Sequence, residues 1–151
     1  MIRLAVIGLG AVTKNIHLPA YRLLKDRLAL VAGCDVDPAT RDAMEKTGLF
    51  HKIYDSPEEM LDKATPDVVS VCTPPFFHHR QCLDALEHGC HVFCEKPLVE
   101  TLAHADEIIL ASSRCKRSVV VNSQFPKMNM YTAAKKQIDS PEFGRLLFLN
   151  A

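Results

Sequence analysis

A short apolar run that ends in two glycines constrains the fold more than any other part of the sequence. Residues 4–7, with the sequence LAVI, are typical of a strand buried on both faces in a parallel sheet. Gly8 and Gly10 follow, where they permit a tight turn and the close approach of a bulky anion. A helix that begins just after these glycines would direct free N–H groups and its positive dipole end at that anion. The stretch therefore predicts the start of a dinucleotide-binding unit.

An acidic residue at the end of the second apolar run supports this interpretation. The run 28–34 leads into Asp35, at roughly the 20-residue offset where such units bind the adenosine ribose. A carboxylate there accepts from a free 2′-hydroxyl and repels a 2′-phosphate, so we expect NAD rather than NADP. Asp35 could instead cap a helix, and Arg41 could serve a phosphate, although one arginine on a helix is more often solvated surface. Thr13 stands where the third glycine of the pattern is usual.

Strands and helices alternate along the following chain. The pattern predicts a helix over 15–24, which Pro19 kinks or restarts. The further expected strands are 28–34, 50–54, 67–72, 91–94 and 118–121, and the further expected helices start at Asp37-Pro38 and at Ser56 and cover 77–87 and 102–112. This order predicts an α/β fold with a doubly wound parallel sheet, the Rossmann arrangement.

The last part of the chain departs from this alternation. We expect a helix over 128–138 and a strand over 141–151 that has no partner in the sequence. The interpretation is a dinucleotide-binding domain over 1–124, with 125–151 as the start of a truncated α/β substrate domain that is essentially absent. The apolar segment 146–149 could also pair between copies, giving a homo-oligomer, or aggregate.

Composition argues against several classes of partner. Eighteen basic and eighteen acidic side chains cancel, so neither nucleic acid nor a membrane surface is an expected partner. Without a bilayer-spanning apolar stretch or a signal-peptide pattern, we expect a cytoplasmic protein. The six cysteines form no C-x-x-C pair and are interpreted as small buried hydrophobes. A zinc site of Cys90, Cys94, His88 and His91 is a less favoured alternative, because alternate strand residues point to opposite faces.

Polar residues follow two further strands at the same edge of the expected sheet. Thr73-Pro74 and His78 come after the fourth strand, and Glu95-Lys96-Pro97 comes after the fifth. Because ligands of open α/β sheets bind beyond the carboxyl ends of the strands, we expect these residues to share a site with the glycine turn. The alternatives are that the prolines only terminate strands and that Lys96 is a surface lysine paired with Glu95.

These residues resemble the Gfo/Idh/MocA family of oxidoreductases. The resemblance covers nearly all of 1–124 and rests on the glycine turn with His17-Leu18-Pro19-Ala20, on Thr73-Pro74 with His78, and above all on Glu95-Lys96-Pro97. Phe143-Gly144-Arg145 resembles the family's entry into its second domain. The resemblance implies NAD(P)-dependent oxidation of a sugar, a polyol or a related hydroxy compound.

The resemblance also implies roles for individual residues. In the family the lysine of E-K-P, here Lys96, binds the reacting hydroxyl and assists proton transfer, while Thr73, Pro74 and Glu95 line the nicotinamide ribose. The Lys96–Pro97 bond is expected to be cis. The expected cofactor-binding set is Gly8, Gly10, Ala11, Val12, Asp35, Thr73, Pro74, His78, Glu95 and Lys96, with no metal.

Some features depart from the family pattern. Gln124 stands where many members have arginine, and the aspartate and histidine of the family's second domain have no counterpart here. We therefore expect the chain alone to bind cofactor weakly and to be inactive. The alternative is a non-catalytic NAD-binding sensor or partner subunit, for which Lys96 would have no use. A third possibility is reduction of an imine or enone.

Overall fold

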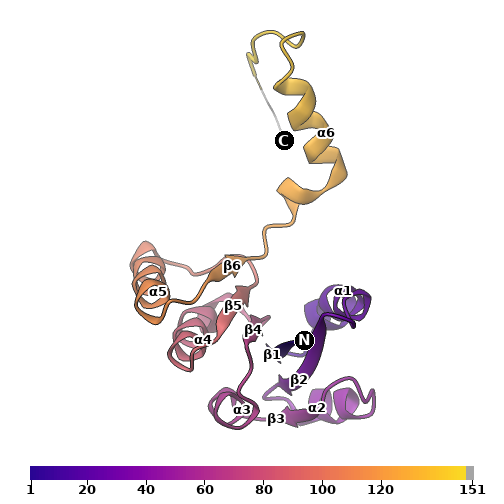
Figure 1. Ribbon diagram of the computed structural model, residues 1–151, viewed down its shortest axis with the longest axis vertical. Helices are drawn as coiled ribbons and strands as arrows, with labels where there is room; N and C mark the ends of the chain where they lie inside the picture. Colours follow the sequence, from indigo (N-terminus) through magenta and orange to yellow (C-terminus); the bar gives the residue numbers. More distant parts are fainter. Residues whose placement is uncertain (149–151) are drawn as a thin grey trace.

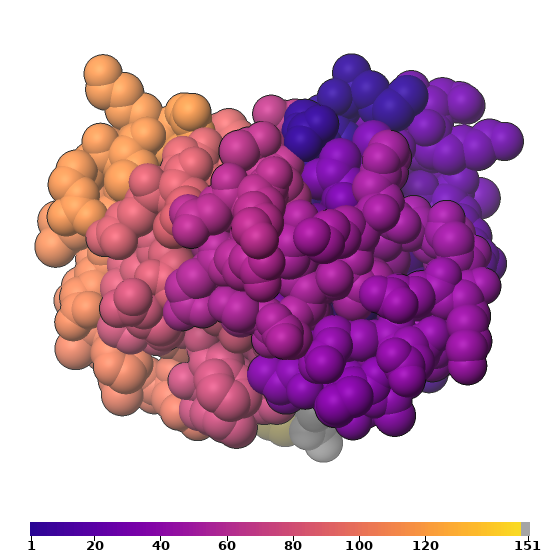
Figure 2. All heavy atoms as spheres, turned by 90° about the horizontal axis from the view of Figure 1, so that it is seen from below, coloured from indigo at the N-terminus to yellow at the C-terminus, as the bar shows by residue number. Residues whose placement is uncertain are grey.

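The computed structural model describes residues 1–148, in which six strands form one parallel sheet in the order β3-β2-β1-β4-β5-β6 (Figure 1). The strands are β1 (Ile2–Ile7), β2 (Leu28–Cys34), β3 (Lys52–Tyr54), β4 (Val68–Val71), β5 (His91–Cys94) and β6 (Val119–Val121). The direction of winding reverses between β1 and β4, so the prediction of a doubly wound Rossmann sheet is confirmed. Figure 2, viewed from the end opposite α6, shows the two halves of the chain on opposite sides of the body.

Three of the helices in the described chain begin at a side-chain cap. The helices are η1 (Thr13–His17), α1 (Leu18–Leu23), α2 (Pro38–Glu45), α3 (Pro57–Ala64), α4 (Pro75–Glu87), α5 (Leu102–Cys115), η2 (Phe125–Lys127) and α6 (Asn129–Ile138). The side chains of Asp37, Ser56 and Thr101 each accept a hydrogen bond from the N–H three residues later. The first helix runs without a break from Ala11 into α1, and the π-helical segment η1 ends just before Pro19, which stands in the first turn of α1.

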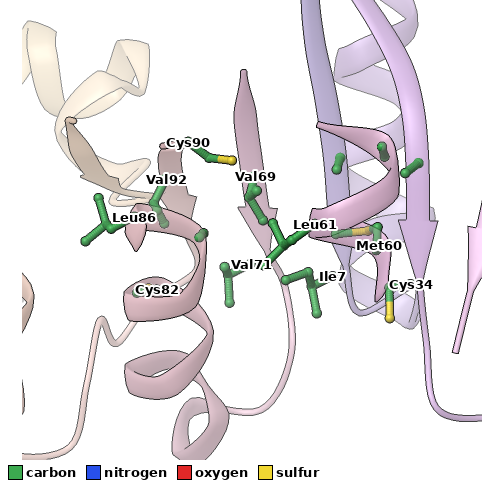
Figure 3. Close-up of a cluster of buried hydrophobic side chains, with 14 of the residues drawn as sticks. Ile7, Cys34, Met60, Leu61, Val69, Val71, Cys82, Leu86, Cys90 and Val92 are labelled. Carbon is green, nitrogen blue, oxygen red and sulfur yellow. The ribbon is translucent and has the colours of Figure 1, made fainter. Parts of the chain in front are cut away.

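Each face of the sheet is covered by a separate hydrophobic layer. On one face, Ala5 and Ile7 of β1 pack with residues of α3, α4 and α5, and Figure 3 shows Met60 and Leu61 beside Ile7. On the other face, Leu4 and Val6 of β1 pack with residues of α1 and α2. Because successive strand side chains alternate between faces, the unbroken apolar run of β1 serves both layers.

The chain after β6 leaves the sheet (Figure 1). Helix α6 has no buried residue and packs mainly against η2. The prediction of a strand over 141–151 is wrong for 141–148, which forms a turn and then irregular chain, while 149–151 lie outside the described residues. A strand needs a neighbouring edge to satisfy its N–H and C=O groups, and this segment has none nearby in the sheet. No helix in the described part is both long and apolar enough to cross a membrane.

Candidate functional site

The glycine turn packs directly against the chain that leaves β4. Gly8 has a φ of +88°, and a Cβ there would lie 2.8 Å from the carbonyl carbon of Cys72. This position therefore requires glycine both for its conformation and for the close approach of a second strand end. A Cβ on Gly10 would meet nothing within 4 Å, so the space above that residue is open. At Gly8 the close contact is made by the main chain of the protein itself and not by an anion. The open space for an anion lies at Gly10.

Thr13 stands at the position of the third glycine, and its side chain makes a hydrogen bond to the glycine turn. Its side chain is fully buried, and Oγ1 donates to the Gly8 carbonyl at 2.5 Å. This contact ties the start of the helix to the turn. Ala11 and Val12, which are also helical, form the first turn, where N–H groups have no partner inside the helix. These N–H groups and the dipole suit an anion above Gly10.

Asp35 extends beyond β2 beside the turn. Its Oδ2 accepts the Leu9 N–H at 2.8 Å, and its Oδ1 accepts the Asp37 N–H at 2.9 Å. A carboxylate has about four acceptor positions, so the half-buried Asp35 retains positions for two further donors. The expected acid is therefore fixed by the main chain rather than serving as a helix cap, a task that Asp37 performs. Arg41 donates Nη1 to the carbonyls of Asp35 and Val36, each at 2.9 Å.

Two cavities meet at the carboxyl ends of β1 and β4. The first, of about 450 Å³, is lined by Gly8, Gly10 and Asp35. The second, of about 730 Å³, is lined by Val12, Glu95 and Lys96 among others. Cys72 and Thr73 line both cavities, which therefore adjoin across the end of β4. Together they form a continuous site along the switch point of the sheet.

The segment after β4 lies between the two cavities. Thr73 and Pro74 line the first cavity, and Thr73 Oγ1 donates to Gln81 Oε1 at 2.6 Å. The predicted contact of His78 with the cofactor needs correction, because this side chain has no exposed surface. Its Nε2 lies 2.7 Å from the Thr73 carbonyl, and its Nδ1 lies 2.9 Å from the Pro97 carbonyl. His78 thus lies beneath the site and joins two of its loops.

Glu95 is the centre of a network that the sequence did not indicate. Its Oε1 lies 2.7 Å from His17 Nε2 and accepts a hydrogen bond from Asn122 Nδ2, also at 2.7 Å. Its Oε2 accepts the Lys96 N–H at 3.1 Å. Burial opposes the charge of this carboxylate, but the hydrogen bonds from Asn122 and His17 outweigh it and lower the pKa of Glu95.

Lys96 lies at the rim of the second cavity with an exposed side chain. Within residues 1–148, no carboxylate lies within ion-pair distance of its Nζ, so the alternative of a Lys96–Glu95 surface pair does not describe this lysine. The Lys96–Pro97 peptide is cis, as predicted. Lys96 is therefore an exposed lysine without an ion-pair partner in residues 1–148, at the edge of the second cavity. The adjacent residues Glu95 and Pro97 are both held by hydrogen bonds.

The residues of the alternative zinc site have other partners. Cys90 Sγ contacts the Pro66 carbonyl, His88 contacts Asp84 and Asp62, and His91 Nδ1 accepts the Ser118 N–H. In the described chain, no three His, Cys, Asp or Glu side chains are grouped to hold a metal ion. All six cysteines are free, and Cys34, Cys82, Cys90 and Cys94 are buried, as expected for small hydrophobes.

Comparison with known proteins agrees with this geometry. Residues 2–123 match the Gfo/Idh/MocA family model, described as "Oxidoreductase family, NAD-binding Rossmann fold". The chain is 41% identical over 107 residues to the D-glucoside 3-dehydrogenase of Escherichia coli strain K12, covering 71% of this chain and 30% of that protein. It is 36% identical over 151 residues to the inositol 2-dehydrogenase of Burkholderia lata, covering 99% of this chain and 44% of that protein.

A solved relative gives the same fold. The WlbA dehydrogenase from Chromobacterium violaceum, in complex with NADH and UDP-GlcNAcA, superposes with a TM-score of 0.87 and 31% identity, covering 95% of this chain and 41% of that chain. The chain thus spans less than half the length of each of these relatives. The family match over most of its length, together with the parallel sheet and glycine turn, shows that the chain belongs to the Gfo/Idh/MocA family of oxidoreductases, as part of the NAD-binding Rossmann region.

Proposed function

We propose that this chain binds NAD and supplies the cofactor-binding half of a dehydrogenase that acts on a sugar, a polyol or a related hydroxy compound. The observation that carries the proposal is the pair of adjoining cavities, one lined by Asp35 and the other by Lys96, with the end of β4 between them. A dinucleotide has two nucleoside ends joined by a diphosphate. The two cavities match the two nucleosides, and the glycine turn with the start of the first helix matches the diphosphate.

The diphosphate is assigned to the start of the first helix. Open space above Gly10 and the first-turn N–H groups of Ala11 and Val12 suit a doubly anionic group. The adenosine ribose is assigned to Asp35, whose two remaining acceptor positions match two hydroxyl groups. The nicotinamide ribose is assigned to the second cavity, beside Thr73, Pro74 and Glu95, as the family resemblance implies.

We propose NAD rather than NADP as the cofactor. A 2′-phosphate would stand next to the Asp35 carboxylate, and repulsion between two anions disfavours it. Arg41 is the candidate to offset that repulsion, and its Nη1 donates to the main-chain carbonyls of Asp35 and Val36. The NADH in the WlbA complex agrees with this choice.

Lys96 is the proposed catalytic residue. NAD, when bound, supplies the hydride acceptor. The Lys96 amine at the cavity rim would hold the substrate hydroxyl, stabilise negative charge that develops on its oxygen, and exchange a proton with it. An amine at this place has a function in an enzyme and none in a cofactor sensor, so it favours the enzyme over the sensor alternative.

The substrate class rests on the relatives. Their names state action on a D-glucoside and on inositol, both polyhydroxy compounds. Since the chain spans less than half of those proteins, we propose that 1–124 is the cofactor domain and that 125–151 begins a second domain, which would supply the remaining substrate contacts. On this proposal, residues 1–151 alone do not turn over substrate.

A charge placed above the turn tests the proposal. NADH fluorescence is titrated with the wild-type chain and with Gly10→Asp. The new side chain enters open space, so the fold, checked by circular dichroism, should persist while NADH binding is lost. Asp55→Ala, which removes an exposed carboxylate outside both cavities, is the control. Undiminished binding by Gly10→Asp would refute the assignment of the diphosphate.

A further inference from the structure

The turn that carries Lys96 is held by a buried histidine on each side. His17, near the glycine turn, contacts the Glu95 carboxylate, which also accepts the Lys96 N–H. His78, on α4, contacts the Pro97 carbonyl. The two histidines come from different elements, and Lys96 lies between the residues that they contact.

The surroundings of His17 define its protonation. Tyr21 donates its single hydroxyl proton to Ser70 Oγ at 2.8 Å, so at 3.3 Å from His17 Nδ1 the Tyr21 oxygen can only accept. Nε2 faces the Glu95 carboxylate, which also only accepts. With Tyr21 and Glu95 both accepting, an imidazolium that carries hydrogen on both ring nitrogens matches this arrangement. Burial opposes this charge, but contacts with the Cys72 thiol and Glu95 raise the pKa of His17 overall.

The surroundings of His78 lead to the same conclusion. Both of its nitrogens face main-chain carbonyl oxygens, of Thr73 and Pro97, and a carbonyl oxygen only accepts. A neutral imidazole has one donor and would leave one carbonyl facing a lone pair. Burial opposes the charge, whereas the Cys94 thiol and the two carbonyls raise the pKa of His78 to about 9.

We propose that His17 and His78 are positioning residues which, as two buried imidazolium ions, clamp the Glu95-Lys96-Pro97 turn and so set the place of the Lys96 amine at the second cavity. The catalytic importance of the clamp rests on the proposed function, whereas the contacts that form the clamp do not. His17, Asn122 and the Lys96 N–H occupy three of the roughly four acceptor positions of Glu95, which leaves one for a ribose hydroxyl.

The clamp is tested first without cofactor. Hydrogen exchange of the Lys96 amide is followed by NMR in the wild type, His17→Gln, His78→Gln and the control His51→Gln, whose histidine is exposed. We expect exchange at Lys96 to be accelerated about tenfold or more in the first two variants and to be unchanged in the control. The amide of Val6, in the central strand, should stay protected in all four proteins. Unchanged Lys96 protection in both variants would overturn the proposal.

Two further measurements separate the clamp from general folding and from the proposed function. In the wild type, the ring signals of His17 and His78 should titrate above pH 6.5, and titration of both below that value would overturn the proposal even if a variant does not fold. In the second, His17→Gln should weaken NADH binding about tenfold and leave ADP binding within about twofold, because ADP lacks the nicotinamide end. Equal losses for NADH and ADP would contradict local positioning. If the wild type binds neither ligand while Lys96 exchange responds as expected, the proposed function fails and the clamp stands.

Discussion

The buried charge of His78 predicts a specific dependence of stability on pH. Its pKa is about 9 in the fold against an ordinary value of 6.5, a difference that corresponds to about 3 kcal/mol. Because the folded pKa is raised, the full contribution is present below pH 6.5 and is lost as the pH rises through about 9. His78 has no exposed surface, so solvent does not screen its contacts.

The assay compares the free energy of unfolding of the wild type and His78→Gln in guanidinium chloride between pH 6 and pH 10, with reductant present. The advantage of the wild type should shrink by about 3 kcal/mol across this range. The contact with the Cys94 sulfur is one of the interactions that raise the pKa of His78, so its contribution is part of the measured difference. The contribution of His17 to the pH dependence is present in both proteins and cancels in the difference between their unfolding free energies. A difference that stays constant with pH would refute the imidazolium assignment.

Two substitutions near the turn give further predictions for stability. Gly8→Ala should lower the free energy of unfolding by about 3 kcal/mol, because it adds a clash with the Cys72 main chain to the strain of a positive φ. Gly48→Ala, at a φ of +64° with open space around it, should cost only about 1 kcal/mol, and equal costs in denaturant titrations would contradict the clash. Thr13→Val should cost about 2 kcal/mol by removing the donor to the Gly8 carbonyl, and thermal unfolding without a shift would contradict that bond.

The fold was predictable because its signals are local. An unbroken apolar run such as β1 indicates a strand with both faces buried, and caps such as Asp37 mark helix starts within a few residues. The helix expected over 77–87 begins two residues earlier, at Pro75, because proline is well tolerated in the first turn of a helix. The strand expected over 141–148 failed because strand formation depends on an available edge, which a local pattern does not show.

The parts of the site that escaped prediction depend on distant contacts. His17 and Glu95 are 78 residues apart, and Asn122 reaches the same carboxylate from a third strand end. No spacing rule joins such residues. His17 lies in the helix after β1, whereas Glu95 and Asn122 directly follow β5 and β6 at the same edge of the sheet. His78 was placed in the cofactor site by its position after β4, whereas its side-chain direction on α4 decided that it lies beneath.

Calorimetric titration of NAD and NADP against the wild type, Asp35→Ala and the control Asp55→Ala tests the cofactor assignment most directly. We expect the wild type and Asp55→Ala to bind NAD more tightly than NADP, since Asp35 offers acceptors to the 2′-hydroxyl and repels a 2′-phosphate. Asp35→Ala should lose about tenfold or more in NAD affinity and most of the discrimination against NADP. Equal NAD binding by the wild type and Asp35→Ala would contradict the assignment.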